Sequence, residues 1–143
     1  MEKKMIIGYT QGVFDMFHIG HLNLLNNSKA RCDYLIVGVN SDELVESYKH
    51  KTPVVCQEYR EAIVGSIKSV DEVHIVDTLD KLEILKKYPF DVIFIGDDWK
   101  GSQRWSDTQQ KLKEYGAEVV YLPYTQNISS TLLRNREGEK IEE

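Results

Sequence analysis

Two histidines three residues apart, His18 and His21, are the part of this sequence best suited to chemistry. They follow an apolar run at residues 5–10 that predicts a short strand, and they begin a helix whose apolar stripe extends to about Arg31. Residues at positions i and i+3 share one face of the first helical turn. Two imidazoles beside the free amides of a helix N-terminus can bind phosphate oxygens and stabilise the charge that develops as a phosphoryl bond breaks.

The glycines of this segment fit the same interpretation. We expect Gly12 to permit the sharp turn between strand and helix, and Gly20 to let a ligand approach the backbone closely. Two alternatives compete with a phosphate site. A histidine pair at this spacing can bind a metal, but the four His and two Cys of the chain supply no third ligand at a familiar spacing. A glycine-containing turn can also be only a turn, so other motifs must support the interpretation.

Apolar runs recur along the chain and predict four more strands, at residues 34–39, 72–76, 91–95 and 118–122. Helices are predicted between them at residues 58–69, 79–88 and 106–115, the last ended by Gly116. This alternation indicates an α/β fold, with one Rossmann-like parallel five-stranded sheet and helices on both faces. Ligands of such sheets bind beyond the carboxyl ends of the strands, where strand order reverses. We expect residues 1–143 to form a single domain, with a polar tail at about residues 136–143.

Composition excludes several classes of partner. The 143 residues carry a net charge of −5, from 18 Lys and Arg against 23 Asp and Glu, so nucleic acid is not an expected partner. No apolar run approaches the roughly 20 residues of a membrane span, so no membrane partner is expected either. The N-terminal Met-Glu-Lys-Lys leads into a strand and not into a signal sequence. The expected location is the cytoplasm.

The segment at residues 12–21 has the pattern Gly-x-Phe-Asp-x-x-His-x-Gly-His, which resembles the signature of the cytidylyltransferases in the HIGH-motif nucleotidyltransferase superfamily. Further similarity lies at residues 41–44, 70–73, 96–99 and 128–131, so the resemblance covers nearly the whole chain. It implies transfer of CMP from CTP to a small phosphorylated alcohol, with glycerol 3-phosphate as the favoured acceptor. The products would be pyrophosphate and CDP-glycerol, a donor for cell-wall or capsular polymers. It also implies a homodimer.

The resemblance assigns roles to individual residues. The nucleotide would be bound by the first motif, through Val13, Phe14, His18 and His21. The two histidines would also be catalytic. Lys49 and Lys51 lie in a polar stretch that could be only a solvated loop, but in the family this segment supplies lysines to both substrates. Lys49 is carried over as the acceptor-phosphate ligand, with a part in catalysis, and Lys51 as a triphosphate ligand.

The support for a role in substrate binding is weaker at three further positions. Lys68 shares a predicted helix with Arg60, and either could belong to its solvated face. The family commonly has arginine at Lys68 and uses it on the nucleotide phosphates, and lysine keeps the charge but loses the bidentate fork. Lys81 is an acceptor ligand by resemblance, although an exposed lysine is the simpler interpretation. Asp71 is expected only to cap its own segment or to pair with a nearby cation.

Two late segments complete the expected site. Asp98 and Trp99 follow a strand, and the resemblance assigns Asp98 to the nucleotide and Trp99 to the acceptor, although a helix cap with a packed indole is also possible. The family's second signature is expected to bind the nucleotide through Tyr124, Thr125, Ile128, Ser129, Ser130 and Thr131. Tyr124 replaces the usual arginine and Asn127 the usual glycine. This stretch also resembles that of adenylyltransferases such as phosphopantetheine adenylyltransferase, so the preference for CTP over ATP stays open.

The expected mechanism is direct in-line attack by an acceptor phosphate oxygen on the α-phosphorus of CTP. An ionised phosphate needs no general base, so positioning and electrostatics must produce the rate. Mg²⁺ would accompany the triphosphate, held mostly by phosphate oxygens and water, and no metal-binding side chains are expected. Phosphocholine, phosphoethanolamine or another polyol phosphate remain alternative acceptors. A non-catalytic nucleotide-binding module is a further alternative, whereas the chain is too short for a tRNA synthetase.

Overall fold

Five apolar runs form five parallel strands in the computed structural model, which describes residues 4–96 and 101–123. The strands are β1 (Ile7–Gly12), β2 (Tyr34–Asn40), β3 (Glu72–Val76), β4 (Val92–Gly96) and β5 (Glu118–Leu122). Their order across the sheet is β3-β2-β1-β4-β5, and each neighbouring pair is parallel. The predicted Rossmann-like sheet is confirmed. Strand order reverses beside β1, so the carboxyl ends of β1 and β4 border the crevice where such sheets bind ligands.

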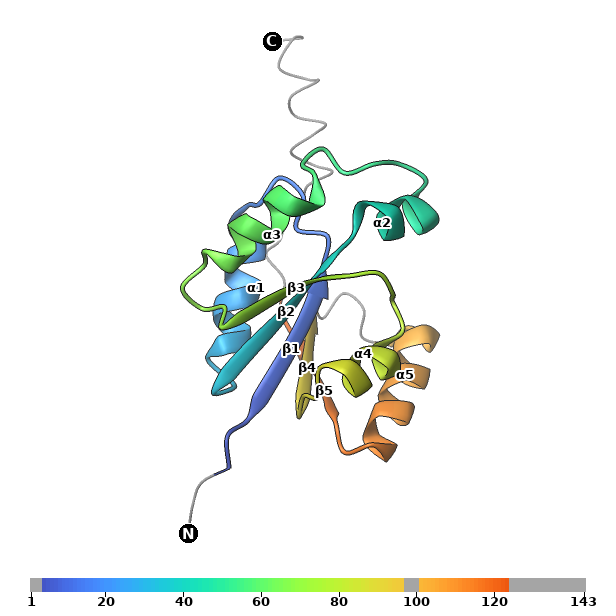
Figure 1. Cartoon of the computed structure of the whole chain (residues 1–143). Coiled ribbons are helices and arrows are strands. Elements are labelled where there is room, and N and C mark those ends of the chain that lie inside the picture. The colour runs from blue at the N-terminus through green and yellow to red at the C-terminus, as the bar shows by residue number, and fades with distance from the viewer. Residues whose placement is uncertain (1–3, 97–100, 124–143) are drawn as a thin grey trace.

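The helices are α1 (Ile19–Lys29), α2 (Asp42–Lys49), α3 (Gln57–Gly65), α4 (Lys81–Lys87) and α5 (Gln103–Glu114). Figure 1 shows α1 and α3 on one face of the sheet and α4 and α5 on the other, as predicted. The short helix α2 follows the carboxyl end of β2 directly. Among the helices that the structure describes, none combines the length and the apolar character needed to cross a membrane.

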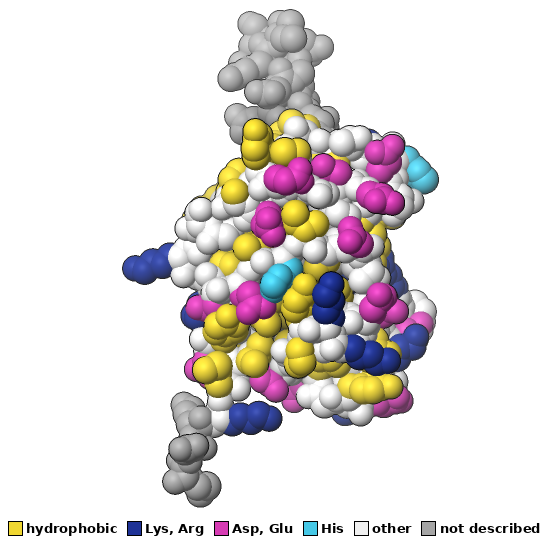
Figure 2. All heavy atoms as spheres, viewed as in Figure 1, with side chains coloured by type: hydrophobic (Ala, Val, Ile, Leu, Met, Phe, Trp, Pro, Cys, Tyr) yellow, Lys and Arg dark blue, Asp and Glu magenta, His cyan; other side chains and the backbone are white. Residues whose placement is uncertain are grey.

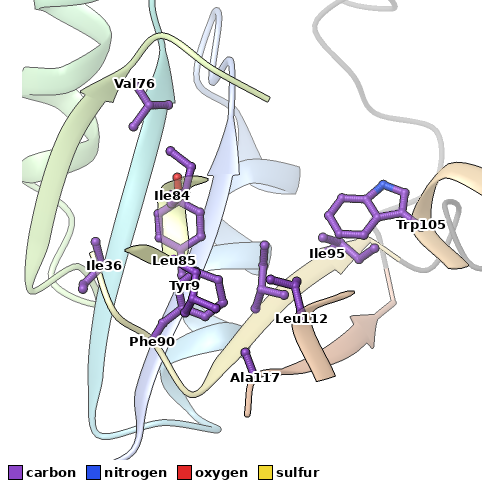
Figure 3. Packing of buried hydrophobic residues seen from close by; sticks show 11 residues of the cluster. Tyr9, Ile36, Val76, Ile84, Leu85, Phe90, Ile95, Trp105, Leu112 and Ala117 are labelled. Atoms are coloured by element: carbon purple, nitrogen blue, oxygen red, sulfur yellow. The ribbon is translucent and has the colours of Figure 1, made fainter. Parts of the chain in front are cut away.

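A separate apolar cluster fills each face of the sheet, which explains why the strands are continuous apolar runs. In β2, Leu35 and Val37 belong to the cluster under α1 and α3, whereas Ile36 belongs to the cluster under α4 and α5. Figure 3 shows the second cluster, in which the indole of Trp105 from α5 lies beside Ile95 of β4. Both faces of the sheet are therefore covered by helices.

Helix α2 was not predicted, and Lys49 was expected in a loop. Ser41 begins this helix because its Oγ accepts a hydrogen bond from the backbone N–H of Leu44 at 3.1 Å. Two acidic residues in the first turn add a favourable interaction with the helix dipole. Lys49 is instead the last residue of α2, and His50 ends the helix in the left-handed conformation, with φ of 57°.

Two other helix bounds differ from the prediction. Helix α5 begins at Gln103, because Ser102 Oγ accepts a hydrogen bond from the N–H of Trp105 at 3.2 Å, and it ends before Gly116, whose φ is 84°. Helix α3 ends at Gly65, where the chain packs closely on β3: an added Cβ there would lie 3.0 Å from Val73. Lys68 therefore lies beyond α3 and not on it.

Candidate active site

The two histidines cap the start of α1 and each other. Nδ1 of His18 accepts a hydrogen bond from the N–H of Gly20 at 3.1 Å, and Nδ1 of His21 accepts one from the N–H of His18 at 3.1 Å. The two rings stack, with centroids 3.8 Å apart and planes inclined by 22°. They share one face as predicted. However, the amides at the helix start were expected to be free for an anion, whereas the two rings occupy those of His18 and Gly20.

Both rings are held neutral. Burial lowers the pKa of His18. Burial, followed by the repulsion that a second protonated ring beside His18 would meet, lowers the pKa of His21 to about 3, against a smaller opposing effect of Asp15. Because each Nδ1 accepts a hydrogen bond, the proton of each neutral ring is assigned to Nε2. The Nε2 atom of His18 is buried and has no partner within the described residues. Each ring can therefore donate an N–H to a phosphate oxygen without carrying charge.

The loop that presents the histidines turns at two residues with left-handed backbone, Phe14 (φ 55°) and Met16 (φ 49°). Gly12 was expected to supply this turn, but it is the last residue of β1, and an added Cβ there would lie 3.2 Å from the Phe14 ring. Phe14 is 3% exposed, and its ring packs edge-on against His21 with centroids 5.4 Å apart. Its side chain thus positions His21, so any contact of Phe14 with a nucleotide would come from its backbone.

Asp15 joins this loop to the segment that follows α2. The residue is 4% exposed, and its two carboxylate oxygens accept hydrogen bonds from the N–H groups of Val54 at 2.8 Å and Val55 at 2.9 Å. Sequence reasoning placed Asp15 in the first motif without giving it a role. Its role here is structural, because it fixes residues 54 and 55 against the loop between β1 and α1, residues 13–18, called the histidine loop below.

Arg60 makes a second and larger connection. The interpretation of Arg60 as part of the solvated face of α3 is wrong, since its side chain is fully buried. The guanidinium donates to Asp42 Oδ1 at 2.5 Å. It also donates, at 2.7–2.8 Å, to the carbonyl oxygens of Val13, Asn40 and Val55. Arg60 lies four residues before the buried Val64 on the inward face of α3, and this helical spacing is the signal that could have revealed it.

The two lysines expected at the substrates lie next to this network. Lys49 ends α2 with its Nζ 5.9 Å from the centroid of the Tyr48 ring, and Lys51 is exposed two residues later. The Tyr48 hydroxyl accepts a hydrogen bond from Asn40 Nδ2 at 3.1 Å, and Asn40 Oδ1 accepts one from Gln11 Nε2 at 2.8 Å. These bonds anchor α2 to the carboxyl ends of β1 and β2, beside the crevice.

Three further positions singled out from the sequence lie away from the two histidines and α2. Lys68 is exposed in the turn that leads into the amino end of β3, so the structure does not bring it to the histidines within one chain. Lys81 begins α4 on the opposite face of the sheet from α1, and it is 8% exposed, so the interpretation of it as an exposed lysine is wrong. Asp71 pairs with Lys29 Nζ at 2.5 Å and accepts from the N–H of Leu35 at 2.8 Å, as predicted.

Part of the expected site lies outside the described residues. This part comprises Asp98 and Trp99, together with the second signature at Tyr124, Thr125, Ile128, Ser129, Ser130 and Thr131. The roles of these residues stay predictions from the sequence.

Comparison with known proteins adds independent observations. The model of the cytidylyltransferase-like family matches residues 9–136. The glycerol-3-phosphate cytidylyltransferase of Bacillus spizizenii is 41% identical over 133 residues, which are 92% of this chain and 95% of that protein. The FAD synthase of Thermococcus onnurineus is 36% identical over 129 residues, covering 86% and 83%. A solved structure of the lipopolysaccharide core biosynthesis protein from Thermoplasma volcanium matches with a TM-score of 0.73 and 27% identity, covering 87% of this chain and 100% of that one.

Proposed function

Since this chain belongs to the cytidylyltransferase-like family and is a nucleotidyltransferase, we propose that it transfers CMP from CTP to glycerol 3-phosphate. The products are CDP-glycerol, an activated glycerol donor, and pyrophosphate. The observation that carries this proposal is the pair of neutral imidazoles at the start of α1, with the buried Nε2 of His18 unpartnered within the described residues. The relative from Bacillus spizizenii supports the choice of nucleotide and acceptor.

In the proposed mechanism, a phosphate oxygen of the acceptor attacks the α-phosphorus of CTP in line. A new phosphorus–oxygen bond forms as the bond to the bridging oxygen of the β-phosphate breaks, and pyrophosphate leaves with the electron pair. The Nε2–H groups of His18 and His21 donate to the nucleotide phosphates, whose charge grows at the leaving group. Lys49 orients the acceptor phosphate, and Lys51 balances the charge of the triphosphate.

Other residues enter the proposal with smaller roles. Val13 and Phe14 contribute backbone groups to the nucleotide site, and Lys81 and Trp99 contact the acceptor. Lys68 could reach a nucleotide only in another arrangement of chains, because it lies at the amino edge of the sheet. The proposed nucleotide ligands outside the described residues are Asp98, Tyr124, Thr125, Ile128, Ser129, Ser130 and Thr131.

Magnesium enters the proposal as the counter-ion of the triphosphate. Within residues 4–96 and 101–123, no group of three His, Cys, Asp or Glu side chains is placed to bind a metal ion. We propose that Mg²⁺ is held mostly by phosphate oxygens and water, which is the coordination that Mg²⁺ commonly keeps with nucleotides. We expect EDTA to abolish pyrophosphate release and added Mg²⁺ to restore it. Release that persists at full rate in EDTA would contradict this role.

A substrate panel tests the proposed reaction. Pyrophosphate release is measured with CTP or ATP, Mg²⁺, and one acceptor at a time among glycerol 3-phosphate, phosphocholine and phosphoethanolamine. We expect turnover with CTP and glycerol 3-phosphate, and CDP-glycerol as the product by mass spectrometry. Turnover with ATP alone would instead establish adenylyl transfer, the alternative favoured by the FAD synthase relative, since FAD is an adenine dinucleotide. Nucleotide binding without any pyrophosphate release would leave only a binding module.

Two further properties are part of the proposal. The homodimer is supported by an apolar surface on α3 and the segment before it, where Val54 is 61% exposed, Tyr59 68% and Ile63 42%. Light scattering on the intact protein and on Tyr59→Glu tests it: a dimer that the substitution weakens is expected, and a monomeric parent chain would contradict it. We also place the activity in the cytoplasm, where CTP and sugar-alcohol phosphates are available.

A further inference from the structure

A network of hydrogen-bonded side chains connects β1 with the last turn of α2. The Tyr9 hydroxyl donates to Gln11 Oε1 at 2.6 Å, and Gln11 Nε2 donates to Asn40 Oδ1 at 2.8 Å. Asn40 Nδ2 in turn donates to the Tyr48 hydroxyl at 3.1 Å. We call these four residues the amide network. It extends from β1 through the last residue of β2 to the residue that precedes Lys49.

The partners of the two side-chain amides determine how each amide is oriented. Gln11 Nε2 also donates to the Thr78 carbonyl oxygen at 3.0 Å, and a carbonyl oxygen can only accept. Burial raises the pKa of Tyr9, so its hydroxyl stays protonated and donates to Gln11 Oε1. The remaining N–H of Gln11 Nε2 therefore faces Asn40 Oδ1, which directs Asn40 Nδ2 to Tyr48. Gln11 thus sets the direction of every bond in the network.

The end of the network that lies on the sheet is firmly packed. Tyr9 is fully buried, and its ring stacks on Phe90 with centroids 5.2 Å apart. Its hydroxyl lies over Gly38 of β2, where an added Cβ would clash with it. Asn40 is 4% exposed, and its carbonyl oxygen accepts a hydrogen bond from Arg60 at 2.7 Å. The network therefore starts from side chains that have little freedom to move.

The last turn of α2, in contrast, has little apolar packing. Val45 is the buried residue of this helix, and residues 46–49 are all exposed. Figure 2 shows Asp and Glu side chains on the surface over α2, at the upper right of the view. A helical turn with few buried apolar contacts opens easily. The bond from Asn40 to Tyr48 is therefore important for holding this turn, and Lys49 with it, against the sheet.

The strand that begins the network also leads to the histidines. Gln11 is the penultimate residue of β1, and the histidine loop follows this strand directly. In the proposed reaction, the acceptor phosphate at Lys49 must meet, in line, the nucleotide bound by His18 and His21. One residue is thus bonded toward the helix that carries Lys49 and is continuous with the loop that leads to the histidines.

We propose that Gln11 is a positioning residue, which through the amide network holds Lys49 at a fixed place relative to the histidine pair. This inference rests on the proposed function, which assigns the acceptor phosphate to Lys49. Gln11 acts on the reaction through Asn40 and Tyr48 and not by contact with substrate. Because a small misplacement of a reacting group lowers the rate steeply, the efficiency of transfer to the acceptor depends on the network.

Steady-state kinetics of three variants test this role. Gln11→Met removes both amide donors of Gln11, Tyr48→Phe removes only the last acceptor, and the double variant combines the two changes. Initial rates of CDP-glycerol formation give kcat/KM for glycerol 3-phosphate and KM for CTP. We expect each single variant to lower kcat/KM for glycerol 3-phosphate about tenfold, with little change in KM for CTP. The control is Tyr115→Phe, at an exposed tyrosine that ends α5, and it should match the wild type.

The double variant distinguishes a connected network from two independent effects. Independent effects of the single substitutions multiply, which would lower kcat/KM about a hundredfold. If both residues act through Asn40, loss of the Tyr48 hydroxyl adds little once Gln11 has been replaced. We therefore expect the double variant to lie within about twofold of Gln11→Met. A loss near a hundredfold would overturn the inference.

Amide hydrogen exchange of the free protein provides a readout that does not depend on turnover. Both single variants should raise the exchange rate at residues 46–50 about tenfold and leave β1 to β5 unchanged, and the control should change neither. Wild-type exchange at residues 46–50 in both variants would refute the positioning role, as would equal increases throughout the sheet or wild-type kcat/KM for glycerol 3-phosphate. If the proposed reaction itself is absent from the wild type, the exchange result alone decides whether Gln11 positions Lys49.

Discussion

His21 shows how local contacts select one form of a catalytic side chain. Its Nδ1 accepts a backbone hydrogen bond, its ring packs between those of His18 and Phe14, and burial lowers its pKa to about 3. A protonated ring would lose the Nδ1 acceptor and break the cap. The site therefore offers directed N–H donors in place of mobile positive charge, which suits stabilisation of a transition state whose charge shifts between oxygens.

The neutral state of His21 predicts how stability depends on pH. An ordinary histidine has a pKa near 6.5, so between about pH 6.5 and pH 3 the unfolded chain binds a proton that folded His21 does not. The free energy of unfolding should consequently fall as the pH is lowered through this window. In His21→Gln this contribution is absent, so urea unfolding between pH 6.5 and pH 5 should show a shallower loss than the wild type. Exposed His50→Gln is the control, and parallel slopes for His21→Gln and the wild type would contradict the prediction.

Among the elements, the histidine loop, the end of β2 and the start of α2 are held together by α3. Arg60 makes the connection, through hydrogen bonds to the carbonyl oxygens of Val13 in the loop and Asn40 at the end of β2, and to the Asp42 carboxylate at the start of α2. Asp15 adds a link from the histidine loop to residues 54 and 55. The arrangement fixes the two imidazoles relative to α2, whose last residue is Lys49, so the proposed catalytic groups belong to one braced unit.

Loss of the Arg60 side chain should lower the free energy of unfolding. Arg60→Met removes the donor of three carbonyl oxygens, of which that of Asn40 is in a buried contact, and of the partly exposed Asp42 carboxylate, and one unsatisfied buried polar group costs about 1–3 kcal/mol. We expect chemical denaturation to show a loss of this size in the free energy of unfolding. Arg31→Met, at an exposed position after α1, is the matched control and should change stability little. A similar small change in both variants would show that Arg60 does not brace the site.

For the molecule as a whole, the sheet was predictable because burial on both faces demands continuous apolar runs. The strands at residues 72–76 and 118–122 have the bounds expected from the sequence. Helix α2 escaped prediction because it is short, largely exposed and determined by its cap. The roles of Asp15 and Arg60 escaped because their partners lie up to 47 residues away in the chain, beyond any local pattern. The histidine pair was found from its spacing, but the mutual capping that sets its charge depends on three-dimensional geometry.

In the proposed mechanism, CMP transfer depends on two uncharged imidazoles that stabilise the phosphates. The most direct test measures CDP-glycerol formation from CTP, Mg²⁺ and glycerol 3-phosphate by the wild type, His18→Ala and His21→Ala. His74→Ala is the control, since this half-buried residue pairs with Glu72 on β3, away from the histidine loop. Each substitution in the pair should lower kcat by about two orders of magnitude or more, the usual effect of removing a preorganised donor, and the control should retain its rate. Rates like those of the wild type in both His18→Ala and His21→Ala would contradict the account.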